Sequence, residues 1–338
     1  MTRPIASVRI ITYNHAPYIA QAIDSVLSQR TSYPHEIIIG EDCSTDGTRE
    51  IALRYQDRYP DRIRVITSEQ NVGARANSLR SNEACQGKYL AFLDGDDYWH
   101  NPTKLQKQID LLEAHPEIGL VHGEANVLDQ ATGDLTRNAH EAAGLRYEDD
   151  PDPFEGLLTE TYRIYTATVC VRKPLLDQVI AANPYELAQP TFLMGDTPRW
   201  LELSRVTRFA YVDESLATYR QLPESASRSE DRDRTIAFFE SGLAMRKHYM
   251  AKYTASPEVH NSCIRTRYAT LLLQALSRRD PVLARYALRS MRAERVPIRP
   301  RHIAWFMASH SSLVQKLWLK ASSLRHRARD EGQVGKRY

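Results

Sequence analysis

The first 125 residues alternate short runs of β-branched residues with longer segments of helical periodicity, and this alternation limits the possible folds more than any other feature. Strands that alternate with helices are typical of βαβ units, which form a parallel sheet with helices on its faces. The expected strands are residues 7–12, 36–41, 63–67, 89–93 and 118–123, and the expected helices are residues 18–29, 48–59, 77–85 and 103–115. We therefore predict an α/β domain with a mostly parallel sheet.

The pattern becomes less regular after residue 125. Residues 129–165 are polar and rich in Gly, Pro and Asp, so we expect them to leave the sheet. The elements expected to complete the domain are a strand at residues 166–171, a helix that begins at Pro174, and short strands at residues 208–212 and 216–219. Helical patterns then continue from about residue 235 to 329. We predict an α/β domain over residues 1–225 and a helical C-terminal region over residues 226–338.

Charge is distributed unevenly between these two parts. The chain carries 45 Lys and Arg against 42 Asp and Glu, a net charge of +3. Of these, 23 basic and 9 acidic residues follow Ala226, so the first part is acidic and the second is strongly basic. Neither a recognition motif nor a basic patch interleaved with aromatic residues indicates a nucleic-acid partner. We therefore expect no nucleic acid to bind.

No segment of the sequence resembles a membrane span or an export signal. There is no stretch of ~18 unbroken apolar residues, so we expect no transmembrane helix. The N-terminal apolar run is too short and too charged for a signal peptide. We expect a reduced, cytoplasmic chain, because its four cysteines are far apart in the sequence: Cys43, Cys85, Cys170 and Cys263.

Three carboxylates directly follow the fourth expected strand: Asp94, Asp96 and Asp97. Their mutual repulsion is costly unless a cation or hydrogen-bond donors offset it. Mg²⁺ and Mn²⁺ are commonly held by one or two carboxylates and complete their coordination with water and substrate phosphates. The cluster therefore predicts a divalent cation beside a phosphorylated ligand. The alternative is an acidic turn that caps the next helix.

Polar residues also follow the first two strands, and in open parallel sheets ligands bind beyond these carboxyl ends. Asp42 can accept a hydrogen bond from the ring N–H of uracil, thymine or guanine, whereas cytosine has no such N–H. The alternative is that Asp42 only forms an Asx-turn before Ser44 or Thr45. A Gly-bearing loop at residues 71–73, followed by the cation Arg75, is a weaker candidate for a contact with phosphate or base.

Asp196 follows an apolar run at the start of an expected helix, and it has two interpretations. As a helix N-cap, it would accept a hydrogen bond from a backbone N–H of the first turn, which Pro198 near the helix start supports. As a general base, it would remove a proton from an acceptor hydroxyl. The local sequence alone favours the cap.

The order and spacing of these motifs resemble glycosyltransferase family 2. The likeness spans roughly residues 4–221. It is carried by Ile10-Ile11-Thr12-Tyr13-Asn14, Glu41-Asp42-Cys43-Ser44-Thr45-Asp46-Gly47-Thr48, Asn71-Val72-Gly73, Phe92-Leu93-Asp94-Gly95-Asp96-Asp97-Tyr98-Trp99 and Tyr219-Arg220. The resemblance implies a Rossmann-like GT-A fold and a reaction that inverts the anomeric carbon. It also implies a nucleotide-binding half up to about residue 125 and an acceptor half over residues 126–225.

The resemblance assigns roles to individual residues. Tyr13 is similar to the family's nucleotide contact on the first strand, and Asp42 to the carboxylate that holds the base. Asp96 and Asp97 match the pair around ribose, diphosphate and metal, which makes Mn²⁺ or Mg²⁺ the expected cofactor. Asp196 is similar to the catalytic base, which reverses the preference for a cap. The implied nucleotide-sugar contacts are Thr12, Tyr13, Asn14, Glu41, Asp42, Asn71, Arg75, Asp94, Asp96 and Arg220.

We therefore predict an inverting enzyme that moves a sugar from a nucleotide-diphosphate donor, with UDP- or dTDP-sugars favoured, to a hydroxyl of a glycan or lipid-linked glycan. Polysaccharide or lipopolysaccharide synthesis is the setting expected from the family likeness. The alternative is a catalytically inactive protein of the same fold that binds a nucleotide sugar or acts as a scaffold. A phosphatase of the haloacid dehalogenase type fits less well, because Tyr98 stands where that pattern requires Thr or Val.

Residues 303–329 alternate apolar and basic positions and include Trp305 and Trp318. Helices with this pattern lie at bilayer interfaces, where anionic lipids attract their basic side chains. We therefore expect peripheral association with the inner face of the cell membrane. The alternative is a helix that packs on the rest of the protein with its charged face in water.

Overall fold

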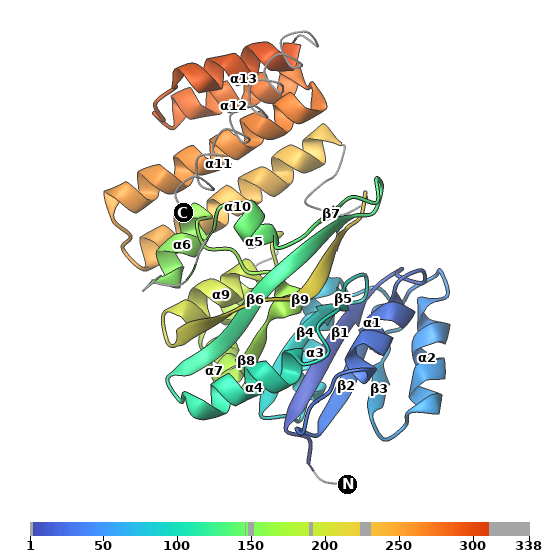
Figure 1. Ribbon diagram of the computed structural model, residues 1–338. Coiled ribbons are helices and arrows are strands. Elements are labelled where there is room, and N and C mark those ends of the chain that lie inside the picture. Colours follow the sequence, from blue (N-terminus) through green and yellow to red (C-terminus); the bar gives the residue numbers. More distant parts are fainter. Residues whose placement is uncertain (1–2, 146, 148–151, 189–191, 224–230, 311–338) are drawn as a thin grey trace, which may run out of the picture. The chain divides into compact units, whose positions relative to one another are not determined.

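The computed structural model describes residues 3–145, 147, 152–188, 192–223 and 231–310. The chain divides into two compact units. The first comprises residues 1–157 and 161–230 and contains the sheet, and the second comprises residues 158–160 and 231–338 and contains a group of long helices (Figure 1). All the predicted site residues belong to the first unit.

Four parallel strands form the first half of the sheet. Their order is β3 (Ile63–Ile66), β2 (His35–Glu41), β1 (Ala6–Thr12) and β4 (Tyr89–Asp94). The connecting helices are α1 (Ile19–Leu27), α2 (Thr48–Arg58) and α3 (Ala74–Ala84). Helix α3 begins three residues before its predicted start, because the positive φ of Gly73 (86°) turns the chain into the helix there. These elements confirm the predicted α/β fold class.

The second half of the sheet is mixed. After β4 its order is β8 (Cys170–Arg172), β6 (Ile118–Asp129), β9 (Arg208–Gln221) and β5 (Tyr98–Trp99), and β7 (Leu135–Thr136) pairs with β6. Strand β8 is antiparallel to both neighbours, whereas β6 and β9 are parallel. The other helices of this unit are α4 (Lys104–Ala114), α5 (Ala139–Ala142), α6 (Pro153–Thr159), α7 (Lys173–Ala182), α8 (Pro184–Ala188) and α9 (Thr197–Ser204).

Two predicted strands differ from the structure. The strand expected at residues 166–171 begins as a 3₁₀ helix, η1 (Thr166–Thr168), because both the backbone N–H and the hydroxyl of Thr168 bond to the carbonyl of Tyr165. The strands expected at residues 208–212 and 216–219 form one strand, β9. This strand remains paired because a β-bulge near Gly123 of β6 absorbs the irregularity in register.

The two faces of β1 differ in chemistry. Ala6, Val8 and Ile10 are fully buried and pack with side chains of α1 and α4 in the main core. Arg9 alternates with them along the strand and is also fully buried, so the opposite face of the sheet carries a charge. A buried charge is costly unless it is paired and hydrogen-bonded. This face of the sheet therefore requires polar partners.

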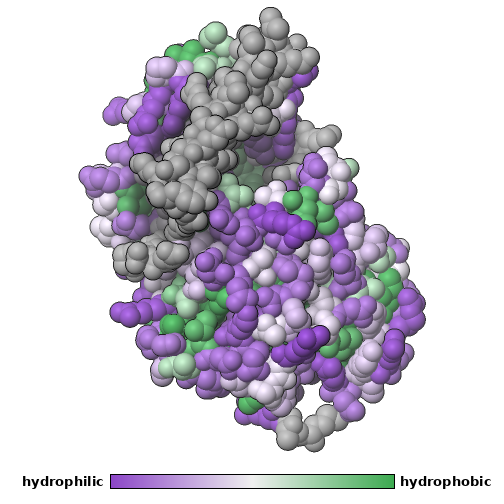
Figure 2. Space-filling view, in the orientation of Figure 1, coloured by the Kyte–Doolittle hydropathy of each residue, from purple (hydrophilic) through white to green (hydrophobic). Residues whose placement is uncertain are grey.

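The drawn face of the first unit is mostly hydrophilic (Figure 2). On the face drawn in Figure 2, hydrophobic residues form small, separate areas. Single exposed hydrophobic side chains are normal on folded proteins, whereas large contiguous patches indicate interaction sites. The drawn face of the first unit therefore offers no large apolar docking surface.

The described part of the second unit consists of α10 (Arg232–Lys252), α11 (Pro257–Arg278), α12 (Pro281–Ala293) and α13 (Pro300–His310). The side chains of Asp231, Ser256 and Asp280 cap the first three. The facing sides of these helices bury a separate apolar core around Leu271 and Leu272. No helix within the described ranges has the length and hydropathy that a membrane crossing requires.

Gly87, just before β4, permits a test of how closely β4 and β1 pack. A Cβ at Gly87 would lie 2.5 Å from backbone atoms of Ala6 and Ser7. We expect Gly87→Ala to lower the free energy of unfolding by about 2 kcal/mol or more, since overpacking typically costs about 1–3 kcal/mol. Gly195→Ala is the control, because a Cβ at Gly195 would meet no atom of the described residues within 4 Å and its φ lies outside the left-handed region. Urea unfolding that gave equal losses for both variants would contradict the close packing.

Candidate active site

The carboxyl ends of β1, β2 and β4 are aligned in register. Thr12 pairs with Glu41, and Ile11 pairs with Asp94. The polar residues that follow these strands therefore emerge at one edge of the sheet, as expected for a ligand site in a parallel α/β fold. Thr12, Asp42 and the acids after β4 are brought together in this way.

Two buried polar atoms beside Gly95 have no hydrogen-bond partner among the described residues: Thr12 Oγ1 and His15 Nδ1. A Cβ at Gly95 would lie 2.5 Å from Thr12 Oγ1 and 2.9 Å from His15 Nδ1, so both atoms approach the turn closely. Unpaired buried polar groups are rare in folded proteins. They are therefore candidates for contact with a ligand or water, and Tyr13 beside them is 43% exposed.

Asn14 and Glu41 are predicted ligand contacts that instead bond within the protein. Asn14 donates its N–H to Ser44 Oγ (3.0 Å), and its side-chain oxygen accepts the N–H of Thr45 (2.9 Å). Glu41 is fully buried, and its two oxygens accept from Ser44 N–H and Arg49 Nε, both at 2.6 Å. These bonds shape the loop after β2, and a direct contact of either residue with a nucleotide stays a prediction.

Asp42 holds the loop at residues 71–73. Its two carboxylate oxygens accept the backbone N–H groups of Val72 and Gly73, each at 2.9 Å. The Asx-turn alternative does not apply, because the N–H of Ser44 bonds to Glu41 instead. Asp42 therefore joins the loop after β2 to the loop before α3.

The other two predicted contacts near this loop also bond within the protein. The side-chain oxygen of Asn71 accepts the N–H of Gly73 at 2.9 Å. Arg75, in the first turn of α3, donates to the carbonyl of Phe192. The predicted role of Arg75 as a cation for phosphate or base thus stays a prediction, since this bond directs its guanidinium toward the segment before α9.

Arg220 fixes the acidic turn after β4. Its backbone N–H donates to Asp97 Oδ1 at 2.7 Å, and its guanidinium donates to the carbonyl of Asp96 and to Gln21 Oε1. The guanidinium also lies over the ring of Tyr18, 4.6 Å from its centroid. Its Nε is buried without a partner among the described residues. Arg220 thus orients the acids and retains one unpaired donor beside them.

Burial and mutual repulsion raise the pKa of two acids of this turn, Asp94 and Asp97. Burial, together with the carboxylates of Asp196 and Asp96, raises the pKa of Asp94 to about 7. Burial and the neighbouring Asp96 and Asp94 raise the pKa of Asp97 well above its usual range. A nearby cation would favour the charged form of each group. The electrostatics of the turn therefore suit a bound cation.

The residues of this turn fit a divalent cation that is only partly enclosed by protein. Asp96 and Asp97 supply the hard oxygen ligands that Mg²⁺ and Mn²⁺ prefer. No group of three His, Cys, Asp or Glu in the described ranges is arranged as a full metal-binding set. The fit is therefore to a cation whose remaining ligands come from substrate phosphates and water.

Asp196 does not act as a helix cap. It precedes α9 as the N-cap residue, but its side chain accepts no hydrogen bond from the helix backbone. Instead, Oδ1 accepts from Arg199 Nη1 at 2.9 Å and Oδ2 accepts from Thr166 Oγ1 at 2.6 Å. The side chain of Asp196 is 36% exposed, and its charge contributes to the raised pKa of Asp94. A solvent-accessible carboxylate thus lies near the acids after β4.

Sequence reasoning missed several residues of this site. Arg199 and Thr166 bind Asp196, Gln21 binds Arg220, and His15 has an unpaired ring nitrogen. The position of Arg199 three residues after Asp196 is the one local signal, because residues at this spacing share a helix face. The other contacts join separate elements.

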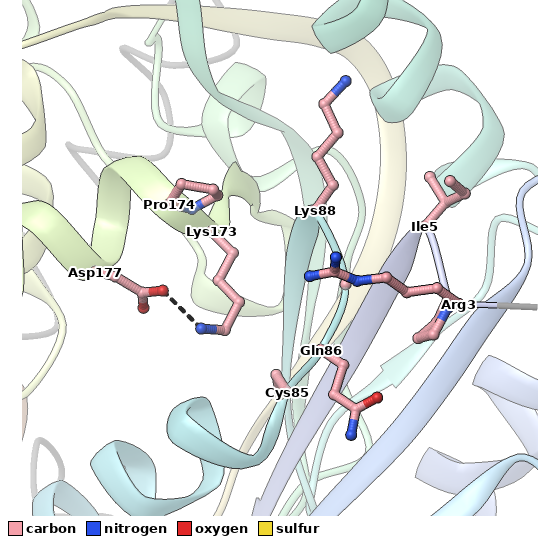
Figure 3. Close-up of a pocket in the computed structure, with 10 residues that line it drawn as sticks. Arg3, Ile5, Cys85, Gln86, Lys88, Lys173, Pro174 and Asp177 are labelled. Carbon is pink, nitrogen blue, oxygen red and sulfur yellow. Dashed lines mark hydrogen bonds and ion pairs between the residues drawn. The ribbon is translucent and has the colours of Figure 1, made fainter.

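A cavity of 740 Å³ lies away from this site, at the amino ends of β1 and β4. Figure 3 shows Arg3, Lys88 and Lys173 around it. Two of these cations are paired: Lys173 with Asp177 at 2.6 Å and Lys88 with Glu113 at 2.8 Å. None of the predicted site residues lines this cavity, which belongs to the edge of the sheet opposite the acids.

Comparisons with known proteins show that the chain is similar to glycosyltransferases. Residues 7–154 match the family model described as glycosyl transferase family 2. Over 250 residues the chain is 32% identical to TuaG of Bacillus subtilis, named as a teichuronic acid biosynthesis glycosyltransferase, and the match covers 73% of this chain and 91% of TuaG. An uncharacterised protein of Mycobacterium tuberculosis is 45% identical over 111 residues. This match covers 33% of the present chain and only 32% of that relative's length.

Solved structures show the same architecture. The mannosyltransferase PcManGT of Pyrobaculum calidifontis, in complex with GDP-Man and Mn²⁺, has a TM-score of 0.53 to this chain at 16% identity. The likeness covers 94% of this chain and 87% of that protein. At this identity it shows the fold alone, and it confirms the predicted architecture.

A melting-temperature panel with UDP, dTDP, GDP and CMP, each with and without Mn²⁺, tests the nucleotide site. We expect UDP or dTDP with Mn²⁺ to raise the Tm of the wild type, because a ligand at 100 times its Kd stabilises the folded state by about 2.7 kcal/mol. Asp97→Ala should lose most of the metal-dependent shift. Asp61→Ala, at an exposed acid before β3, is the control. A metal-dependent shift of full size in Asp97→Ala would contradict the assignment.

Proposed function

The chain belongs to glycosyl transferase family 2, and from this premise we propose that it is an inverting glycosyltransferase with a nucleotide-diphosphate sugar as donor. The observation that carries the proposal is the position of Asp196. Its side chain is partly exposed, and its charge contributes to the raised pKa of Asp94. A carboxylate that can accept a proton therefore lies beside the acids that follow β4. A base and a leaving-group site in one place are what a direct displacement requires.

The nucleotide of the donor is proposed to lie over the ends of β1 and β2. Tyr13 is 43% exposed and can stack on the base. Each oxygen of Asp42 accepts one backbone N–H and retains a second lone pair, which can accept a ring N–H of uracil or thymine. The unpaired Thr12 Oγ1 and Arg220 Nε provide polar contacts for ribose or diphosphate. These groups suit a base that carries a ring N–H, and we propose UDP- or dTDP-sugars as the donors.

Asp96 and Asp97 are proposed to hold Mn²⁺ or Mg²⁺, with Asp94 beside them. When bound, such a cation stabilises the charge that develops on the departing diphosphate. The chain's own contribution is orientation, because Arg220 binds Asp97 through its backbone and Asp96 through its guanidinium. Both acids thus keep their place at the end of β4.

The proposed transfer is a single displacement at the anomeric carbon. A bond forms from the acceptor oxygen to this carbon as the bond from the carbon to the diphosphate oxygen breaks, and the electron pair of the broken bond leaves with the diphosphate. Asp196 takes the proton of the acceptor hydroxyl and later returns it to water. Attack from the side opposite the leaving group inverts the anomeric configuration.

Asp196→Asn tests the base. The substitution keeps the size of the side chain but removes its ability to take a proton. We expect release of nucleoside diphosphate to fall about 10²–10⁴-fold, the usual contribution of a general base, while nucleotide binding in the melting assay persists. Asp61→Asn serves as the control. Wild-type turnover in Asp196→Asn would disprove the assignment. A wild type that binds nucleotide but turns over no UDP-, dTDP- or GDP-sugar would favour the inactive alternative.

A role in polysaccharide synthesis is proposed for the reaction. TuaG, which this chain matches over most of its length, is named for teichuronic acid biosynthesis, and this likeness supports a glycan product. The acceptor would be a hydroxyl of a glycan or of a lipid-linked glycan. Such a hydroxyl is a weak nucleophile, so a carboxylate base in contact with it speeds the reaction.

Peripheral attachment to an anionic membrane is proposed for the second unit. The outward face of α12 carries Arg285, Arg289 and Arg292, opposite its buried side chains. On α13, Ile303 and Met307 are 49% and 55% exposed and lie one helical turn apart. Arginines attract anionic headgroups, and exposed apolar side chains enter the interface. Residues 311–329 of the predicted membrane segment 303–329 lie outside the described residues.

Flotation of the full-length protein with liposomes tests this attachment. We expect binding to phosphatidylcholine vesicles that contain phosphatidylglycerol and little binding to phosphatidylcholine alone, because each Arg near an anionic surface contributes about 1 kcal/mol. Arg285→Glu/Arg289→Glu should lose most of the binding. Arg54→Glu/Arg58→Glu, with the same spacing on the exposed face of α2, is the matched control. Equal binding by both variants would contradict a role for α12.

A further inference from the structure

The carboxylate of Asp196 is held by donors from two different elements. Thr166 of η1 donates its hydroxyl to Oδ2 at 2.6 Å, and Arg199 of α9 donates Nη1 to Oδ1 at 2.9 Å. A carboxylate with a charged donor on one oxygen and a hydroxyl on the other has a defined orientation. The direction in which Asp196 can accept a proton is thus set by its neighbours.

Arg199 is in turn held from the sheet side. It is 3% exposed, and its Nη2 donates to Ser78 Oγ of α3 at 2.9 Å. Arg9 of β1 donates to the same oxygen, and Asn82 accepts a second bond from Arg9 at 3.3 Å. A serine oxygen has two lone pairs and can accept from both guanidinium groups. Ser78 therefore connects β1 and α3 to the helix that follows Asp196.

The two guanidinium groups repel each other, and nearby acids offset this repulsion. Burial and Arg199 lower the pKa of Arg9 to about 10, whereas Asp94 and Asp196 act in the opposite direction. The Arg9 guanidinium also lies over the ring of Phe92, 4.6 Å from its centroid. Buried like charges persist only where opposite charges and hydrogen bonds compensate them. The compensated cluster consists of Arg9, Asp94, Asp196 and Arg199.

We propose that Arg199 positions Asp196 for proton transfer, and that Ser78 and Arg9 hold Arg199 in the required place. This inference rests on the proposed role of Asp196 as the base. An arginine with only a structural role would stabilise the fold without changing the reaction at Asp196. A positioning residue changes turnover at saturating substrate more than nucleotide binding, because the proposed nucleotide contacts lie on other residues.

Arg199→Met and Arg199→Lys in the full-length protein test the proposal. Release of nucleoside diphosphate is measured from UDP-glucose, UDP-N-acetylglucosamine or GDP-mannose, whichever turns over fastest, over a range of donor concentrations that reaches saturation. We expect Arg199→Met to lower kcat about ten- to hundredfold with the donor KM within about threefold of wild type.

Arg199→Lys and two further variants separate positioning from packing. Lysine keeps the charge, so it should restore part of kcat but not all of it, because one ammonium cannot replace the two hydrogen bonds that the guanidinium makes to Asp196 and Ser78. Ser78→Ala removes the shared hydroxyl without a change of charge and should lower kcat several-fold. Arg205→Met, at the exposed end of the same helix, should match wild type. If Arg199→Met does not fold, Ser78→Ala decides the test.

Failure of this inference can be distinguished from failure of the proposed function. Wild-type kcat in a folded Arg199→Met or Ser78→Ala would overturn the positioning role. If Asp196→Asn is inactive at the same time, the base assignment stands and only the positioning role is wrong. If Asp196→Asn is as active as wild type, the base assignment is wrong and the positioning role is overturned with it.

Discussion

Arg9 and Arg199 meet at a single serine hydroxyl in the interior of the first unit, and several elements must be in place for these two charges to be buried together. Arg9 needs a strand with one polar face, and Arg199 needs a helix that begins beside that face. Asp94 and Asp196 supply the opposite charges. Because an unpaired buried charge costs several kcal/mol, separating these elements would leave a charge uncompensated. The cluster thus links the strands of the nucleotide side to the helix that follows the proposed base.

Asp94 couples the two parts of the proposed site. It lies at the end of β4, and burial together with the charges of Asp196 and Asp96 raises its pKa to about 7. Any positive charge at the acidic turn would favour ionised Asp94 and thereby alter the field at Asp196. The proposed metal ligand Asp96 and the proposed base Asp196 thus both act electrostatically on Asp94. This coupling follows from the short span between Asp94 and Asp97 and from the position of α9.

The strands of the first half were predictable because their signals are local. Each consists of a short, mostly apolar run that ends at polar or acidic residues, and the register of β1 with β2 and β4 then places Thr12, Glu41 and Asp94 at one edge. Local hydrogen bonds explain where this reasoning failed. The backbone N–H and the hydroxyl of Thr168 bond to Tyr165, so η1 forms where β-branched composition alone favoured a strand.

The sequence by itself determined the α/β alternation, the family and the acids that end β4, because these depend on residue types at short, fixed spacings. It could not decide whether Asp196 caps a helix, since the residues that bind its carboxylate are not all its neighbours. Thr166 lies 30 positions away, and Ser78 lies 121 positions from Arg199. Only the tertiary structure brings these groups together, because the hydrogen-bond partners and opposite charges that allow Arg9 and Arg199 to be buried come from separate elements.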